Sequence, residues 1–383
     1  MNENMKNITF KSGDDELFSK EAYQNGFNLV GKAGSGMSTY LKSNILVPAL
    51  QEGRGFFYVE GKGDFANVDN IKQMLEKYNK EKDLQIIDFS GRNDSDSASL
   101  SLLENGSADG LTETLVNFFS IMSGENAWVS DMAMEFMTAL LFPLVVLRDL
   151  DLMVSRDDIV KIHSLEDFNN HKKVKLTLHA LSGYLSYEAL IDLVYMFKSL
   201  LDDENFNDML SSNKEYKDIK DFSSIKGRLT PLVNFLQRRG VDVLDVETKP
   251  NYAELEASVK KMNSYAVTSW TKAFATFGNE TFYSTFFNDE KMVSLAESVK
   301  NNKIILVVLP SMQASVEKSH KMVGALNLIV KSYLASLLTG KVKESANEPY
   351  LFVYDGVEVD ESIVSLLRAI DNKSVGLVST SQE

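Results

Sequence analysis

The chain has 383 residues, 44% of them hydrophobic and 25% charged, the values of a globular protein long enough for two or three structural units. The absence of cysteine excludes disulfides and thiolate chemistry, and the four histidines do not have the spacing of a structural metal site. The net charge of −14, with basic and acidic residues interspersed, disfavours direct binding of duplex DNA, which normally requires a basic face.

The amino terminus and the most apolar segment predict neither a signal peptide nor a membrane span. Residues 1–11 are polar. Residues 136–147 form the most apolar stretch, but they are too few for a span of about 20 residues, and they include Pro143. This stretch predicts a buried helix, and the chain is expected to be cytoplasmic.

Both ends of the chain alternate short apolar runs with longer amphipathic ones. This alternation predicts a parallel sheet whose strands are joined by crossover helices. At the first end the expected elements are a strand at 27–30, a helix from about 38 to 50, a strand at 55–59, a helix over about 67–79 and a strand at 84–89. At the second end they are a strand at 303–309, a helix over about 318–338, a strand at 350–355, a short helix over about 360–370 and a strand at 375–379.

The middle of the chain is predicted to be helical. Apolar residues recur there at spacings of three and four, in the stretches 111–122, 131–147, 185–201 and 252–277. We therefore expect an α/β domain with a mostly parallel sheet, made of residues 1–99 and 302–383, and a large all-α domain inserted at 100–301.

The sequence predicts the environments of two tryptophans and two arginines in the helical part. Trp128 and Trp270 lie on apolar helical faces, so both are expected in the core. Arg238 and Arg239 precede Gly240 at a predicted helix C-terminus, where cations interact favourably with the helix dipole. Contact of these arginines with a phosphate is the alternative.

Residues 31–38 match the phosphate-binding pattern GxxxxGK[ST] at every position except Met37. The glycines let backbone N–H groups point at phosphate oxygens, and the helix that follows adds the partial positive charge of its N-terminus. Ser38 is expected to place its hydroxyl on Mg²⁺, with ATP as the nucleotide. The residues expected to contact the nucleotide are Gly31, Lys32, Gly34, Ser35, Gly36, Met37, Ser38 and Thr39.

Met37 stands where the pattern has the lysine that reaches the β- and γ-phosphates. A thioether carries no charge, so nucleotide binding is expected to be weaker and phosphoryl transfer to lose charge stabilisation. Two other lysines are candidates to replace it. Lys32 occupies the position at which deviant P-loops of the ParA and MinD kind keep an additional lysine, and Lys62 follows a strand at the same edge of the predicted sheet. The alternative is that both are turn lysines in water.

Residues 350–355 form an apolar strand that delivers Asp355 to the carboxyl edge of the predicted sheet. An aspartate there can hold the water shell of Mg²⁺. ATPases of this kind usually have a glutamate next to it, which polarises the attacking water, but this chain has Gly356. The alternative interpretation is that Asp355 only ends a buried strand.

In their order along the chain these motifs resemble the ATPase region of type IV secretion coupling proteins, the TraD/TraG group, and most closely its DotL branch. The aromatic strand and turn at 55–64 are similar to a family strand that ends in a turn of the pattern D-x-K-G-[DE]. The strand at 375–382 resembles a family strand that ends in a sensing glutamine, here Gln382. The strands at 304–310 and 349–355 also match the family. Asp149 after Arg148 matches an Arg-Asp pair in the family's helical insert.

The resemblance implies a RecA-like P-loop core that binds ATP and Mg²⁺, with Ser38 and Asp355 at the metal and Asp355 and Gln382 in catalysis. It also implies a hexamer at the cytoplasmic face of the bacterial inner membrane, which exports protein or relaxase–DNA cargo in conjugation or secretion. Met37 and Gly356 depart from the family pattern, and the family's amino-terminal membrane helices have no expected counterpart in this sequence.

Two functional hypotheses follow from these motifs. In the first, the chain is a weakly active or inactive ATPase that serves in substrate recruitment and assembly, because both Met37 and Gly356 are off-pattern. In the second, it is an active hexameric motor in which Lys32 or Lys62 replaces the lost charge, because Ser38, Asp355 and Gln382 are in place.

Overall fold

The computed structural model describes residues 6–9, 23, 26–32, 34–90, 97–119, 127–213, 216, 222–243, 249–277, 283–310, 316–340, 342, 349–370 and 374–382. The chain forms two compact units, one made of residues 1–106 with 280–383 and the other of residues 107–279. The expected insertion at 100–301 is wider than this second unit. Residues 100–106 and 280–301 belong to the first unit, where two short strands, β5 (Ser99–Leu100) and β6 (Met292–Val293), pair with each other.

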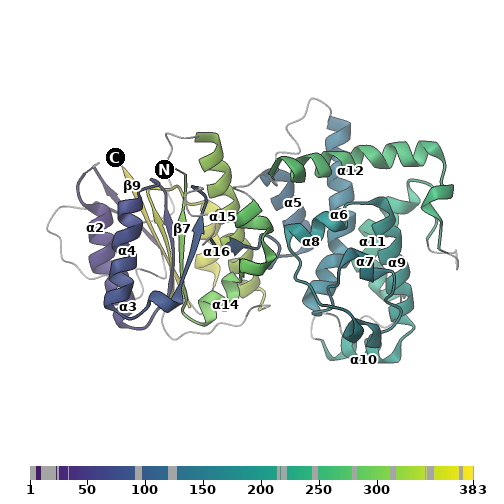
Figure 1. Ribbon diagram of the computed structural model, residues 1–383, viewed down its shortest axis with the longest axis horizontal. Helices are drawn as coiled ribbons and strands as arrows, with labels where there is room; N and C mark the ends of the chain where they lie inside the picture. Colours follow the sequence, from purple (N-terminus) through teal and green to yellow (C-terminus); the bar gives the residue numbers. More distant parts are fainter. Residues whose placement is uncertain are drawn as a thin grey trace. The chain divides into compact units, whose positions relative to one another are not determined.

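A seven-stranded sheet is the centre of the first unit (Figure 1). Its strands lie in the order β1-β2-β9-β8-β3-β7-β4, and every neighbouring pair is parallel. The strands are β1 (Lys6–Thr9), β2 (Phe27–Gly31), β3 (Phe56–Glu60), β4 (Leu84–Asp88), β7 (Ile304–Val308), β8 (Tyr350–Asp355) and β9 (Val375–Gln382). This is the mostly parallel α/β core that the alternation of apolar runs predicted. The edge strand β1 was not predicted, because its sequence is polar.

Helices cover both faces of this sheet, which is why its central strands are apolar on both sides. One face carries α2 (Met37–Leu41), the π-helix η1 (Lys42–Leu46), α3 (Val47–Gln51) and α4 (Phe65–Lys77), whose apolar residues share a buried core with Phe56, Tyr58 and Val353. On the other face, Tyr333 of α15 (Val316–Leu338) packs on Phe352, and α16 (Glu361–Ala369) contacts β9. The remaining elements of this unit are α14 (Leu295–Lys300), η2 (Glu81–Asp83), η6 (Tyr283–Phe287) and η7 (Asp289–Lys291).

All elements described in the second unit are helices. Its elements are α5 (Ala108–Phe118), α6 (Ala127–Asp149), α7 (Arg156–Ile159), η4 (Glu166–Asn170), α8 (Leu178–Gly183), α9 (Tyr187–Leu201), α10 (Glu204–Ser212), α11 (Phe222–Gln237), η5 (Tyr252–Glu254) and α12 (Ala257–Phe277). Of the helices that the structure describes, α6 is long and apolar enough to cross a membrane, but 67% of its apolar window is buried inside the protein. Because α6 packs against α5, α11 and α12, it is the core helix of this unit, as residues 136–147 predicted.

The two tryptophans differ in their environments. Trp270 is fully buried, and its indole N–H donates a hydrogen bond to the Ala133 carbonyl at 2.7 Å. Trp128 is 49% exposed and stands edge-on to Tyr265, which is also exposed, so the prediction of a core position is wrong for Trp128. Apolar periodicity identifies one face of a helix, but it does not show whether another element covers that face at the helix end.

Candidate nucleotide-binding site

The turn between β2 and α2 has the backbone of a phosphate-binding loop. Gly34 and Gly36 have φ angles of 77° and 89°, in the left-handed region that glycine adopts without steric cost. The amide of Ser35 donates to the Lys32 carbonyl at 3.1 Å, which closes the turn before α2 begins at Met37. Ala33 lies outside the described residues. The local sequence thus builds the curved backbone that the glycine pattern predicted.

The side chain of Met37, at the end of the phosphate loop, is buried rather than exposed to solvent. A Cβ added to Gly31 would lie 3.0 Å from the Met37 sulfur, so the methionine side chain folds back over the end of β2. The thioether fills apolar space there and supplies no charge. Lys32, the first candidate to replace the missing lysine, is exposed on the turn.

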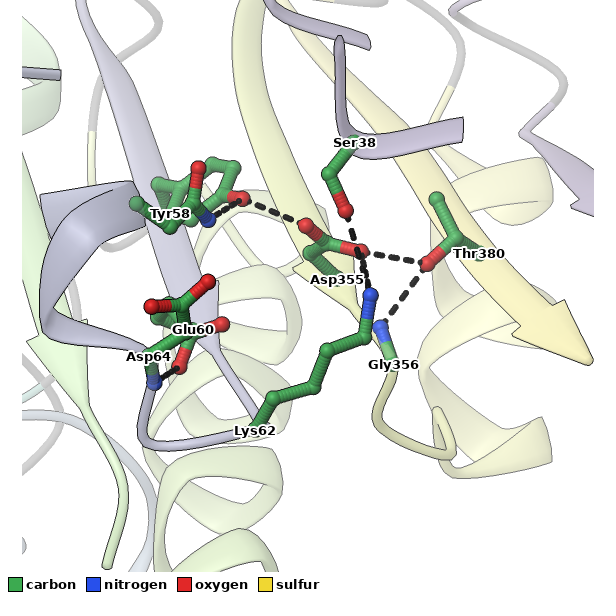
Figure 2. A network of polar contacts seen from close by, with 9 residues as sticks. Ser38, Tyr58, Glu60, Lys62, Asp64, Asp355, Gly356 and Thr380 are labelled. Atoms are coloured by element: carbon green, nitrogen blue, oxygen red, sulfur yellow. Dashed lines mark hydrogen bonds and ion pairs between the residues drawn. The ribbon is translucent and has the colours of Figure 1, made fainter. Parts of the chain in front are cut away.

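Asp355 is fully buried at the end of β8, and hydroxyl groups bind both of its carboxylate oxygens (Figure 2). The Tyr58 hydroxyl donates to Oδ2 at 2.7 Å, and the Thr380 hydroxyl donates to Oδ1 at 2.8 Å. Tyr58 in turn accepts a hydrogen bond from the side-chain amide of Asn67 at 3.0 Å. Burial, and secondarily the Asp355 carboxylate, raise the pKa of Tyr58 well above its usual value, so this hydroxyl stays a donor. Asp355 is therefore held in one orientation by neighbouring strands.

Lys62 joins the phosphate loop to the acid strand. Its ammonium donates to the Ser38 hydroxyl at 3.1 Å and lies 3.5 Å from Oδ1 of Asp355 (Figure 2). The Lys62 side chain is 41% exposed, so its stem is free to turn. A cationic group thus lies between the hydroxyl and the carboxylate that were predicted to hold Mg²⁺.

The turns after β3 and β8 pack closely against each other at two glycines, Gly61 and Gly356. The amide of Gly61 donates to the Asp355 carbonyl at 3.0 Å, and a Cβ on Gly61 would lie 2.1 Å from a methyl group of Val357. Gly356 has a φ of 71°, and a Cβ there would lie 3.0 Å from Cε of Lys62. The Lys62 side chain therefore passes over Gly356, and a side chain at that position would require Lys62 to shift.

Glu60 is a second buried carboxylate at this edge of the sheet. It is the last residue of β3, fully buried and paired in the ladder with Asp355. Its Oε2 accepts a hydrogen bond from the amide of Asp64 at 2.9 Å, whereas its Oε1 is buried with no hydrogen-bond partner among the described residues. Burial raises the pKa of Glu60, and the nearby Asp355 carboxylate adds to this effect, while backbone N–H groups of the turn oppose it.

The predicted site residues converge at one edge of the sheet. The strands β2, β9 and β8 are adjacent and parallel, and a single ammonium contacts both Ser38 and Asp355. Gln382 pairs with Gly31 in the ladder, but its side chain lies outside the described part, and Thr39 is exposed on α2. Their roles stay predictions. Tyr58, Glu60 and Thr380 were missed, because only the strand order and register place Thr380 opposite Asp355.

The comparisons with known proteins agree with the motifs. No family model matches the chain. The type 4 coupling protein DotL of Legionella pneumophila is 22% identical over 360 residues, which cover 90% of this chain and 40% of DotL. The resemblance to type IV coupling proteins is thereby confirmed. The chain spans two fifths of the length of this curated coupling protein.

Solved structures of coupling proteins have a low similarity to this chain. The bacterial conjugative coupling protein TrwBdeltaN70 in its unbound monoclinic form is 13% identical with a TM-score of 0.42, covering 97% of this chain and 67% of that one. The plasmid coupling protein TrwB in complex with a non-hydrolysable GTP analogue is 13% identical with a TM-score of 0.44, and it covers 97% of this chain and 68% of that one.

Proposed function

We propose that the sheet-containing unit of this coupling-protein relative binds a Mg²⁺–nucleotide, with ATP as the ligand, and that Lys62 supplies the positive charge lost at Met37. The contact of the Lys62 ammonium with both Ser38 and Asp355 carries this proposal. A phosphate-binding loop needs a cation on a flexible stem beside its serine and its acid, and Lys62 has this position although it comes from another strand.

The side chains present fit Mg²⁺ as well as nucleotide. The Lys62 ammonium already stands as a cation between Ser38 and the Asp355 carboxylate. The described residues include no group of three His, Asp or Glu side chains able to hold a metal, so Ser38, Asp355 and the phosphates themselves would hold the ion. Bound there, Mg²⁺ would supply positive charge that neutralises the charge developing on the phosphates.

Each residue of the site has a distinct part in nucleotide binding. The backbone amides of residues 31–38 and the N-terminus of α2 bind phosphate oxygens. Tyr58 and Thr380 keep the Asp355 carboxylate oriented. With Mg²⁺ held by Ser38 and Asp355, the half-exposed Lys62 would direct its ammonium to the phosphates. The buried Met37 packs against the loop and contacts no phosphate.

The sequence similarity to DotL over 90% of the chain supports a proposal for the role of the whole protein. We propose that the chain acts in a hexamer at the cytoplasmic face of the bacterial inner membrane. Its partners there are secretion-system components and protein or relaxase–DNA cargo, which the helical unit recruits. The alternative, a recruitment module that does not use nucleotide, is favoured only by the residues Met37 and Gly356.

A nucleotide titration with and without Mg²⁺ tests the binding proposal. We expect a fluorescent ATP analogue to bind in a Mg²⁺-dependent manner, and Lys62→Ala to weaken binding about 10- to 100-fold, the loss of one charge-assisted contact. Lys77→Ala, at an exposed lysine of α4, is the matched control and should leave the affinity unchanged. Lys32→Ala tests the other candidate lysine. No binding by the unmodified chain, or equal affinities of Lys62→Ala and Lys77→Ala, would contradict the proposal.

A further inference from the structure

Glu60 has a feature that nucleotide binding does not explain. Its side chain is fully buried, yet one carboxylate oxygen, Oε1, has no hydrogen-bond partner among the described residues. A buried carboxylate oxygen without a partner loses the solvation it has in water, so it is destabilising for the fold. Groups of this kind occur in proteins at sites of catalysis or ligand binding.

A purely structural role explains only one of the two carboxylate oxygens of Glu60. Oε2 accepts from the amide of Asp64, and Asp64 in turn caps α4 by accepting from the amide of Ala66. A glutamine would serve that role equally well, because its amide oxygen also accepts a hydrogen bond. The structural role therefore requires neither a charge nor the second oxygen.

Glu60 lies at the same edge of the sheet as the proposed nucleotide site. Glu60 pairs with Asp355 in the ladder, so the two side chains emerge from neighbouring strands at the same carboxyl edge. Tyr58, two residues before Glu60, points to the same face of the sheet, where its hydroxyl binds Asp355. This is the face that α2 covers, and Figure 2 shows Glu60 beside Tyr58 in the network around Asp355.

We propose that Glu60 is the carboxylate that activates the attacking water in ATP hydrolysis, in place of the glutamate that is absent at Gly356. This inference rests on the proposed nucleotide binding. Glu60 and Lys62 lie on either side of Gly61, whose amide binds the Asp355 carbonyl. One turn, residues 60–64, then supplies both the base and the cation that the phosphate loop and the acid strand lack.

The chemical step that Glu60 serves is the hydrolysis of a phosphoanhydride. The oxygen of water forms a bond to the γ-phosphorus while the bond from that phosphorus to the β–γ bridging oxygen breaks. The bond's electron pair leaves with ADP, and the water proton passes to Oε1 of Glu60, which later releases it to solvent.

The test separates nucleotide binding from hydrolysis in the full chain. Glu60→Gln keeps the acceptor for the Asp64 amide but takes up no proton. We expect its Mg²⁺–ATP affinity to stay within about 3-fold of the unmodified chain, while turnover falls at least about 100-fold, the usual contribution of a general base. Nucleotide recovered from the variant after incubation should be ATP, whereas the unmodified chain should yield ADP. Glu76→Gln, at an exposed site on α4, is the matched control.

Thermal unfolding of Glu60→Gln shows whether the variant is folded, so that its turnover is compared with that of the unmodified chain in folded protein. Hydrolysis by Glu60→Gln at the unmodified rate would overturn the inference. So would nucleotide binding by the unmodified chain without any hydrolysis, which leaves the proposed binding function intact. Failure of the unmodified chain to bind nucleotide would overturn both.

Discussion

At the scale of single residues, Gly356 links the two departures from the P-loop pattern. The sequence lacks a lysine at position 37 and a glutamate at position 356, and relaxed catalysis was the expected common cause. In the structure, Lys62 passes over Gly356, and a Cβ at that position would lie 3.0 Å from Lys62 Cε. The glycine therefore makes room for the lysine that stands near Ser38.

A residue with a side chain at position 356 should weaken the site rather than restore it. We expect Gly356→Ala to cost about 1–2 kcal/mol because of its left-handed backbone, and to weaken nucleotide binding because Lys62 is displaced. Gly53→Ala is the matched control, since its φ of 75° imposes the same backbone cost with nothing within 4 Å of the added Cβ. Thermal unfolding and nucleotide titration measure the two effects. Unchanged affinity in Gly356→Ala would show that Lys62 does not need this path, and Gly356→Glu should likewise fail to increase hydrolysis.

Tyr58 should contribute to stability through its hydroxyl, whereas the hydroxyl of Tyr350 should not. Tyr58→Phe leaves Oδ2 of Asp355 without its donor and the Asn67 amide without its acceptor, so we expect a loss of about 1–3 kcal/mol. Tyr350 is also fully buried, but its hydroxyl has no partner within the described part of the chain, and Tyr350→Phe should be neutral or stabilising. Calorimetric unfolding of the two variants gives the comparison. Equal effects would mean that the Tyr58 hydrogen bonds are not formed in solution.

At the scale of elements, apolar runs located the strands, and β8 was predicted with its observed bounds. The phosphate loop and the acid strand could be predicted because each is a local pattern of consecutive residues. Strand order could not be predicted in this way. The insertion of β9 between β2 and β8 depends on the pairing of residues far apart in the chain, and this pairing alone brings Thr380 to Asp355.

The helix after the phosphate loop also shows what a local pattern misses. It was predicted from about 38 to 50 as a regular helix, but residues 42–46 form a π-helix between α2 and α3. Pro48 lies in the first turn of α3 and has no N–H to donate to the preceding turn. A change of hydrogen-bond spacing before a proline relieves that defect, and periodicity of apolar residues does not reveal it.

In the helical unit, Arg239 should hold the end of α11 against α6. Its guanidinium donates to the Phe235 carbonyl and to Glu135 of α6, both at 3.1 Å, and lies 3.7 Å above the Phe235 ring. These contacts confirm the predicted interaction of a cation with a helix C-terminus. We expect Arg239→Met, which keeps an apolar stem, to lower the free energy of unfolding by about 1–3 kcal/mol.

Arg238 is the matched control for that variant. Its side chain is 69% exposed and its contact with Glu135 is longer, at 3.5 Å, so Arg238→Met should cost less than about 0.5 kcal/mol. Urea unfolding followed by tryptophan fluorescence reports this unit alone, because both tryptophans of the chain, Trp128 and Trp270, lie within residues 107–279. Similar costs for the two variants would contradict the assigned role of Arg239.

At the scale of the whole molecule, an insertion at 100–301 was predicted, and the compact helical unit of the structure comprises residues 107–279. Composition distinguishes helical from alternating segments, but β5, η6, η7, β6 and α14 are each too short to show a periodicity that assigns them to one unit. They join the sheet-containing unit through contacts such as the β5–β6 pair and the bonds of Ser294 and Leu295 to Glu104. Such contacts join residues about 190 positions apart, so they appear only in the folded chain.

The charge of the whole chain leads to a prediction about DNA. With 54 acidic and 40 basic residues, the protein should repel a polyanion at long range, and its affinity for duplex DNA at physiological salt should be weaker than about 10⁻⁴ M, the weak limit of typical non-specific binders. Anisotropy of a labelled duplex, measured at about 50 and 200 mM salt, checks this. A micromolar dissociation constant that rises steeply with salt would contradict the prediction, because phosphate contacts by clustered lysines and arginines produce that dependence.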